Sequence, residues 1–267
     1  MRAQKSRWEK TETGLYVPSI EMGGDVSEDA VQLLSESSFF ADFVFRSPQR
    51  ENGKHLREIT DVLIWFDNQL ISVQVKGMDD EAPNEKDVED WVRTNLAKAY
   101  SQAKGVKRHF KMGKNRSFLF NELQGNTQID PETIDKIHSL IVLDHPQHKY
   151  LPSDLIPELQ NPDLATHIFS LEDFRNVCAE FSTIPDFVCY LNDRETLMKK
   201  EPIEVGRETD FLAWYILSRP YQKDERFQGD IAEGLGDHFL ATYRERLNKR
   251  SIAKEPLNNR PKQTGCG

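Results

Sequence analysis

Hydrophobic and polar positions are most clearly patterned between Glu58 and Gly77. Residues 58–66 and 69–76 are rich in β-branched and aromatic side chains, a composition typical of β-strands. Asp67 and Asn68 lie between the two segments, and both residue types tolerate the positive φ of a two-residue hairpin turn. The pattern therefore predicts an antiparallel β-hairpin whose tip is formed by these two residues.

The predicted turn sets the register of the hairpin. With a two-residue loop, Phe66 faces Gln69 and Asp61 faces Gln74. Directly opposed residues of an antiparallel pair lie on one face, with Cβ atoms roughly 4.5–5.5 Å apart. Lys76 lies two residues beyond Gln74 and shares that face, so a carboxylate, a carboxamide and an ammonium group are expected in one patch. A loop of three or four residues moves Asp61 away from Gln74 by one residue or more.

Helical and strand patterns also occur along the rest of the chain. Apolar residues recur at helical spacing through residues 87–110, and the continuous apolar run at 140–143 is typical of a buried strand. Ser27 is predicted as a helix N-cap, and polar residues 47–57 are predicted to form a loop. The predicted helices span residues 28–37, 87–110, 171–181, 184–200, 209–219 and 237–250, and the further predicted strands span residues 39–46, 116–121, 134–144 and 165–169.

The bulk composition of the 267-residue chain is that of a soluble, folded protein. Hydrophobic residues make up 37% and charged residues 30%, and no run of 18 or more apolar residues occurs, so no membrane span is expected. The basic N-terminus lacks an apolar segment, which argues against a secretory signal. Cys178, Cys189 and Cys266 show no metal-binding spacing, which favours a reducing compartment. We therefore expect a cytoplasmic location.

Positive charge is concentrated in one segment, although the net charge of the chain is −9. Between residues 98 and 116 basic side chains recur, and neither Asp nor Glu occurs. Such a segment can contact phosphate groups, or it can be the solvated face of a helix. The residues predicted to contact nucleic acid are Lys98, Gln102, Lys104, Lys107 and Arg108.

The predicted hairpin carries an acid, Asp61, which is followed after a short spacer by a Q-x-K motif formed by Gln74 and Lys76. This arrangement resembles the PD-(D/E)XK nuclease superfamily, which has the restriction-endonuclease-like fold. Gln74 stands where Glu or Asp is usual, as in a branch that includes methylation-dependent restriction enzymes, and Thr60 stands where Pro is common. The resemblance covers about residues 20–145. It implies an α/β fold with an αβββαβ core, in which helices flank a mixed central sheet, and a helical C-terminal extension.

The resemblance also implies a catalytic metal site. It makes Asp61, Gln74 and Glu28 catalytic and metal-binding residues, together with the backbone carbonyl of Val75 as a metal ligand. Lys76 is then the catalytic residue that holds the scissile phosphate or lowers the pKa of the attacking water. The implied ion is Mg²⁺, which prefers oxygen ligands, and Mn²⁺ is expected to substitute for it.

The same residues also have interpretations without catalysis. Asp61 and Lys76 can form an ordinary cross-strand ion pair. Glu28 can be an exposed acid that stabilises a helix N-terminus. Glu36 is the second match to the family's helical glutamate.

Four regions are expected along the chain: an N-terminal arm at 1–20, a nuclease-like core at 21–145, a mostly helical region at 146–250 packed on the core, and a disordered tail at 251–267. The expected function is metal-dependent hydrolysis of phosphodiester bonds, with DNA as the substrate, in defence or repair. The alternative is a catalytically inactive nuclease-fold scaffold or a nucleic-acid-binding subunit. The expected partner is nucleic acid and not a membrane, with a homodimer or a protein partner contacting the C-terminal helices.

Overall fold

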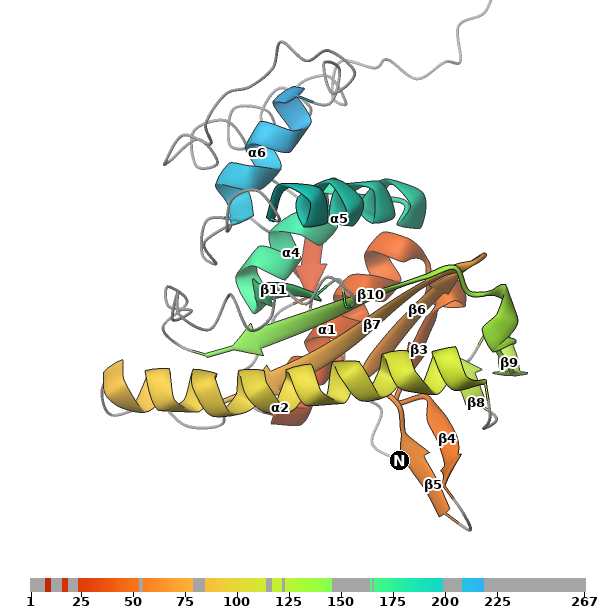
Figure 1. The fold of residues 1–267 in the computed structure, drawn as a ribbon. Helices are drawn as coiled ribbons and strands as arrows, with labels where there is room; N and C mark the ends of the chain where they lie inside the picture. Colours follow the sequence, from red (N-terminus) through yellow and green to blue (C-terminus); the bar gives the residue numbers. More distant parts are fainter. Residues whose placement is uncertain are drawn as a thin grey trace, which may run out of the picture.

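A mixed five-stranded sheet forms the centre of the fold (Figure 1). Its strand order is β11-β10-β7-β6-β3. The strands are β3 (Val44–Arg46), β6 (Val62–Phe66), β7 (Gln69–Gly77), β10 (Lys136–Asp144) and β11 (Thr166–Ser170). The computed structural model describes residues 8–10, 16–18, 24–52, 55–78, 85–113, 117–121, 123–145, 164, 166–198 and 208–218.

The sheet combines an antiparallel half and a parallel half. Strands β3, β6 and β7 pair antiparallel, whereas β7, β10 and β11 pair parallel. A parallel pair requires a crossover connection, and α2 (Glu85–Met112) lies between β7 and β10 in the chain. The predicted α/β class and the predicted mixed sheet flanked by helices are therefore confirmed.

Helices cover both faces of the sheet, and α1 (Gly24–Phe39) lies opposite α2 (Figure 1). The face on the α1 side also carries α4 (Leu171–Glu180), α5 (Ile184–Met198) and α6 (Glu208–Ser218), whose apolar residues belong to the same core cluster as those of α1. Within the described ranges, no helix combines the length and apolar character needed to cross a bilayer.

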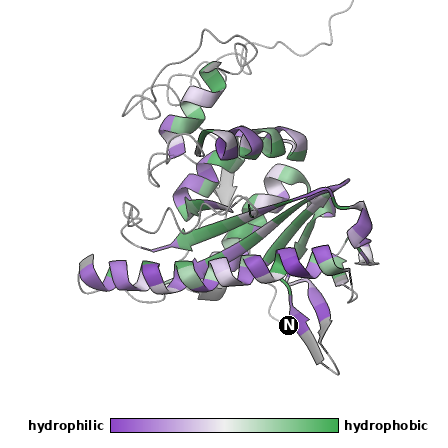
Figure 2. Cartoon of the chain, viewed as in Figure 1, coloured by the Kyte–Doolittle hydropathy of each residue, from purple (hydrophilic) through white to green (hydrophobic). Residues whose placement is uncertain are grey.

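The alternation of side chains along the central hairpin divides the core into two layers. Val62, Ile64 and Val73 belong to the cluster on the α1 side, whereas Leu63 and Leu70 belong to the cluster on the α2 side. All five are nearly inaccessible to solvent, and burying each stabilises the fold by roughly 1.5–3 kcal/mol. The central strands are accordingly mostly hydrophobic, while α2 carries many hydrophilic residues (Figure 2).

The polar segment predicted as a loop at residues 47–57 instead contains two strands. β4 (Gln49–Asn52) pairs antiparallel with β5 (His55–Glu58) and also with β8 (Ser117–Asn121), which in turn pairs with β9 (Gly125–Thr127). The loop prediction was wrong because these strands have few apolar residues and project from the central sheet (Figure 1), so they lack the alternation that marks a half-buried strand.

Two predictions near the first helix are also wrong. Ser27 lies inside α1 and not at its N-cap, and its buried hydroxyl donates to Asp144 Oδ2 at 2.7 Å. Only the last part of the strand predicted at 39–46 is a strand, because α1 extends through Phe39 and Ala41–Phe43 forms the 3₁₀ helix η1. Phe39 stacks on Phe187 of α5 at 4.8 Å between ring centroids, a tertiary contact that the local pattern does not reveal.

The remaining predicted elements agree with the structure to within a few residues. The long helix at 87–110, the buried strand at 134–144 and the helices at 171–181, 184–200 and 209–219 correspond to α2, β10, α4, α5 and α6. Another short 3₁₀ helix, η2 (Pro131–Thr133), precedes β10. In the predicted N-terminal arm, β1 (Trp8–Lys10) pairs with β2 (Tyr16–Pro18). The helix predicted at 237–250 and the tail at 251–267 lie outside the described residues.

Candidate functional site

The predicted hairpin is formed by β6 and β7, and its predicted register is confirmed. Phe66 pairs with Gln69 and Val62 pairs with Val73. Asp67, the first residue of the turn, has a φ of 52°, the left-handed conformation that Asp and Asn tolerate better than most residues. The register places the residue before β6, Asp61, beside the part of β7 that carries the Q-x-K motif.

Asp61 and Lys76 meet at this point of the sheet. The Asp61 Oδ2 atom lies 3.5 Å from Lys76 Nζ and accepts a hydrogen bond from the backbone N–H of Val75 at 2.6 Å. The ammonium group of Lys76 also donates to the Val75 carbonyl oxygen at 2.7 Å. The Asp61 and Lys76 side chains are only 9% and 12% exposed, so their charges interact in a partly water-excluded environment.

Gln74 lies on the α2 side of the sheet and is fully buried. Its Nε2 atom donates to Thr60 Oγ1 at 2.9 Å, and Thr60 Oγ1 in turn donates to the Val73 carbonyl oxygen at 2.8 Å. The other amide atom, Gln74 Oε1, is buried and has no hydrogen-bond partner among the described residues. A buried acceptor without a partner costs roughly 1–3 kcal/mol, and binding of an ion or a water removes this cost.

The oxygen atoms around this position fit a hard divalent cation. Asp61 offers a carboxylate, Gln74 offers the partnerless Oε1 atom, and Val75 offers a backbone carbonyl oxygen. Mg²⁺ takes oxygen ligands and retains several waters. Within the described part of the chain, no three His, Cys, Asp or Glu side chains gather around one point, so this set contains a single carboxylate. Neutral ligands bind such an ion less strongly than carboxylates do, and a substrate phosphate would complete the shell.

Glu28, the predicted further ligand, lies half-buried near the start of α1. Its neighbour Ser27 is tied to Asp144 at the end of β10, and Asp144 pairs with Gly77 at the end of β7. This start of α1 is thereby fixed at the sheet edge that also carries Lys76. Glu36 lies two turns further along the helix and accepts a hydrogen bond from Gln32 at 2.6 Å. Neither glutamate lines the cleft that contains Asp61 and Gln74, and the role of Glu28 as a ligand stays a prediction.

A cleft of about 440 Å³ opens beside Asp61 and Gln74. One wall comes from α2 and includes Gln102 and Arg108, and another comes from the β4–β5 hairpin and includes Arg50 and Arg57. Gly105 also lines the cleft, and a Cβ added at this position would meet no atom within 4 Å. The full lining is Arg50, Arg57, Glu58, Ile59, Thr60, Asp61, Gln74, Ser101, Gln102, Gly105, Val106, Arg108 and His109.

The five residues predicted to contact nucleic acid all belong to α2, but they do not all line the same cleft. Gln102 and Arg108 line the cleft with Asp61. Lys98 and Lys104 are exposed on α2 but are not part of this lining, and Lys104 lies over the Tyr100 ring at 4.7 Å.

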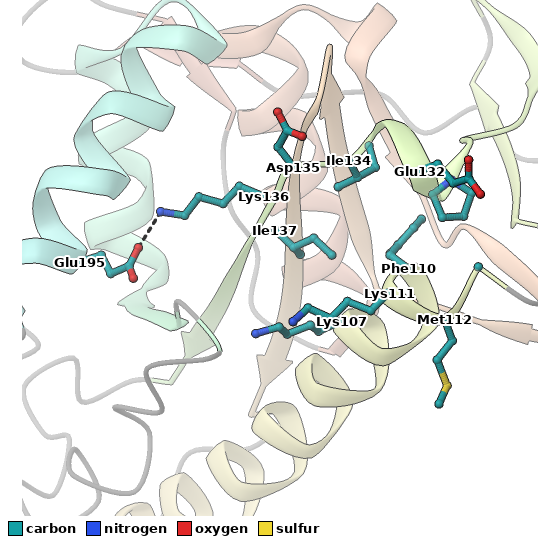
Figure 3. Close-up of a pocket in the computed structure, with 12 residues that line it drawn as sticks. Lys107, Phe110, Lys111, Met112, Glu132, Ile134, Asp135, Lys136, Ile137 and Glu195 are labelled. Carbon is teal, nitrogen blue, oxygen red and sulfur yellow. Dashed lines mark hydrogen bonds and ion pairs between the residues drawn. The ribbon is translucent and has the colours of Figure 1, made fainter.

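Lys107 lines a second cleft, of about 500 Å³, between the end of α2 and the start of β10 (Figure 3). Lys111 lies beside it, while Lys136 reaches away to Glu195 of α5, with 2.7 Å between Nζ and Oε2. The lining of this second cleft includes acids and lysines but no Asn or Gln side chain, so it does not combine an acid, an amide and a lysine. The candidate site is therefore the cleft at Asp61.

Arg50, Arg57, Thr60 and His109 are among the cleft residues that were not predicted from the sequence. The two arginines fell in the predicted loop, although Gly53 at the middle of that segment is a hairpin signal. No role was predicted for Thr60, the residue before the acid, but its hydroxyl accepts the hydrogen bond that orients the Gln74 side chain.

His109 at the base of the cleft remains neutral near pH 7. It is buried, and its Nε2 atom lies 2.9 Å from Ser117 Oγ on β8. Burial, and secondarily the charge of Arg50, lowers the pKa of His109 to about 4. Its imidazole therefore adds no positive charge to the cleft.

The lowered pKa of His109 predicts a pH dependence of stability. Between its folded pKa of about 4 and the ordinary value of 6.5, the unfolded chain binds more protons than the folded chain, so acidification favours unfolding. The contribution is fully present above pH 6.5 and is lost as the pH falls towards 4. Urea unfolding should show a decline of up to about 1.4 kcal/mol per pH unit in the wild type that is missing from His109→Gln. Parallel curves for the two proteins would contradict this assignment.

The arrangement can bind a cation and a phosphate side by side: oxygen ligands at Asp61, Gln74 and Val75, an ammonium group at Lys76, and guanidinium groups along the cleft. These groups suit chemistry at a phosphate ester. Comparison of the chain with protein-family models, with curated proteins and with solved structures found no match.

Proposed function

We propose that this protein is a divalent-metal-dependent nuclease that hydrolyses phosphodiester bonds, with DNA as its substrate. The observation that carries the proposal is the meeting of Asp61 and Lys76, 3.5 Å apart, beside the buried and partnerless Oε1 atom of Gln74 at the edge of an open cleft. A cross-strand ion pair explains the contact between Asp61 and Lys76, but it does not explain the buried Gln74 Oε1 atom that has no hydrogen-bond partner among the described residues.

The order of elements supports a restriction-endonuclease-like core. When only the central-sheet strands are counted, α1 is followed by β3, β6 and β7, then by α2 and β10, which corresponds to αβββαβ. The β4–β5 hairpin is inserted between β3 and β6, and β8 and β9 are inserted between α2 and β10. The antiparallel β3-β6-β7 unit and the parallel addition of β10 give the mixed sheet of that fold. The resemblance of the Q-x-K motif to the superfamily rests on the same hairpin. Defence or repair is the setting that the resemblance favours.

Each residue of the site has a role that follows from its contacts. Asp61, Gln74 and Val75 would hold Mg²⁺ or Mn²⁺, which supplies a counter-charge for the phosphate and lowers the pKa of a bound water. The Val75 N–H orients the Asp61 carboxylate, and Thr60 fixes the Gln74 amide so that Oε1 remains available. Lys76 would bind a non-bridging phosphate oxygen and stabilise the negative charge that develops on it.

The proposal is tested by incubating pure protein with plasmid DNA and Mg²⁺ or Mn²⁺. Wild-type protein should cleave only with the ion, and Asp61→Asn should reduce the rate at least about a hundredfold because a carboxylate ligand is lost. Calorimetric titration with Mn²⁺ should show a weakened or absent site in the same variant. Equal cleavage by wild type and Asp61→Asn would indicate a contaminating nuclease and remove the support for the proposal.

The matched control is Asp67→Asn in the turn of the same hairpin. The substitution makes the same change of charge, and Asn tolerates the positive φ of Asp67. Cleavage and Mn²⁺ affinity should stay within about twofold of wild type, since a surface substitution away from the site changes stability little.

The single-carboxylate ligand set also favours a second candidate function, a nucleic-acid-binding subunit without cleavage activity. This candidate predicts salt-dependent binding of DNA by wild-type protein and no metal-dependent cleavage. Plasmid cleavage with the ion and DNA binding at several salt concentrations therefore separate the two functions.

A further inference from the structure

Two arginines face each other across the β4–β5 hairpin. Arg50 of β4 pairs directly with Arg57 of β5 in the antiparallel register. Like charges at directly opposed positions destabilise a hairpin. A pair of this kind is easier to understand if an anion lies between or beside the two guanidinium groups.

A third arginine approaches the pair from another element. Arg108 of α2 lines the same cleft as Arg50 and Arg57, and we call these three residues the arginine trio. The charges of Arg57 and Arg108 add to the effect of burial in lowering the pKa of Arg50. Three positive side chains from three elements therefore converge on one space.

Carboxylates do not neutralise the trio within the described residues. No ion pair joins any of the three to an Asp or Glu side chain there, although Glu58 and Asp61 also line the cleft. The Nε atom of Arg50 is buried and has no hydrogen-bond partner among these residues. A buried guanidinium N–H group without an acceptor is a second, independent indication that a ligand oxygen belongs in this cleft.

The position of the trio indicates which anion it would hold. The same cleft is lined by Asp61 and Gln74, so a bound anion would lie close to the proposed metal position. A nucleic-acid strand carries regularly spaced phosphates, and a strand with one phosphate at the metal must place its neighbours nearby. Arginine suits phosphate because its planar group donates two parallel hydrogen bonds.

We propose that Arg50, Arg57 and Arg108 form a second phosphate subsite that holds a backbone phosphate of the nucleic-acid strand next to the one that is cleaved. The inference rests on the proposed nuclease function and adds the residues that bind and position the strand. It also gives the β4–β5 hairpin a role as one wall of the nucleic-acid channel.

The test measures the binding of a fluorescent 20-nucleotide DNA, single-stranded or duplex, by anisotropy in EDTA, so that no cleavage occurs. Substituting all three arginines by glutamine should weaken binding about a hundredfold or more. The slope of log Kd against log salt should fall by about one for each arginine removed, because each releases one phosphate contact. Unchanged affinity and slope would overturn the subsite.

The control removes three positive charges outside the cleft, with Lys86→Gln, Arg93→Gln and Arg175→Gln in one protein. This variant has the same net charge as the trio variant and should bind within about threefold of wild type. Equal weakening of both variants would mean that overall charge, and not a subsite, governs binding, and this result also overturns the inference.

Two further measurements test whether the variant is folded and whether the phosphate charge is recognised. The Tm of the trio variant should equal or slightly exceed that of wild type, because the Arg50–Arg57 like-charge pair is removed, and weaker binding then does not result from unfolding. DNA with neutral methylphosphonate linkages should bind wild type and the trio variant equally weakly. A persistent difference on the neutral strand would contradict recognition of phosphate charge.

The outcomes also separate this inference from the proposed function. Cleavage by wild-type protein together with normal DNA binding by the trio variant rejects the subsite and leaves the nuclease function standing. Binding that depends on the trio, without cleavage in any divalent ion, supports the subsite and rejects the nuclease function.

Discussion

Lys76→Met is expected to reduce metal-dependent DNA cleavage by about 10²–10³-fold. Lys76 Nζ lies 3.5 Å from the Asp61 carboxylate, and both side chains are largely shielded from solvent. A positive group at such a position stabilises charge that develops in the transition state, and the loss of one such group typically has an effect of this size. Single-turnover cleavage of plasmid DNA at saturating Mg²⁺ measures it.

The affinity for Mn²⁺ distinguishes Lys76 from the ligands. An ammonium group close to a cation site repels the cation, so Lys76→Met should bind Mn²⁺ as tightly as wild type or more tightly, whereas Asp61→Asn should bind it more weakly. Lys76→Arg retains the charge and should recover part of the activity. A Lys76→Met protein that cleaves at the wild-type rate would exclude a catalytic role for this residue.

The largest effect on stability is expected from Glu208→Gln. Arg194 and Glu208 form a fully buried pair that joins α5 to α6, with Arg194 Nη2 2.7 Å and Nε 2.9 Å from the carboxylate oxygens. Tyr190 also donates its hydroxyl to Glu208. Removing one partner leaves the other charge buried without compensation, which typically costs about 3–5 kcal/mol. Urea unfolding measures the loss.

Two comparisons make this stability prediction specific. Glu89→Gln breaks the exposed pair with Arg93 on α2 and should cost at most about 0.5 kcal/mol. The double substitution Arg194→Met with Glu208→Leu removes both buried charges and should restore much of the stability lost in Glu208→Gln, because similar apolar residues can replace a buried pair. An effect of Glu208→Gln as small as that of Glu89→Gln would show that the pair is not buried in solution.

The hairpin and its chemical groups were predictable because the information is local. Asp67 and Asn68 define the turn, the turn defines the register, and the register brings Asp61 beside the Q-x-K motif. Period-two alternation and turn chemistry suffice for this step. The long α2 helix and the buried β10 strand follow from local periodicity in the same way.

The arginine walls of the cleft could not be predicted in this way. Arg50 and Arg57 lie on polar strands that pair with each other, and β4, which carries Arg50, also pairs with β8, a segment far away in the sequence. The true start of α1 was missed for a related reason, since Ser27 bonds Asp144 across 117 positions of the chain. Contacts of this kind depend on tertiary packing and leave no periodic signal in the sequence.

The parallel ladder between β7 and β10 has a consequence for the order in which the protein folds. Asp61, Gln74 and Lys76 belong to a local hairpin, which can close within microseconds. Joining β10 to β7 requires closure of a much longer chain segment that includes α2, and such nonlocal pairing forms slowly. In a newly made chain, the hairpin that carries Asp61, Gln74 and Lys76 would therefore form before α2 packs beside it. The proposed activity should appear only after β10 has paired with β7.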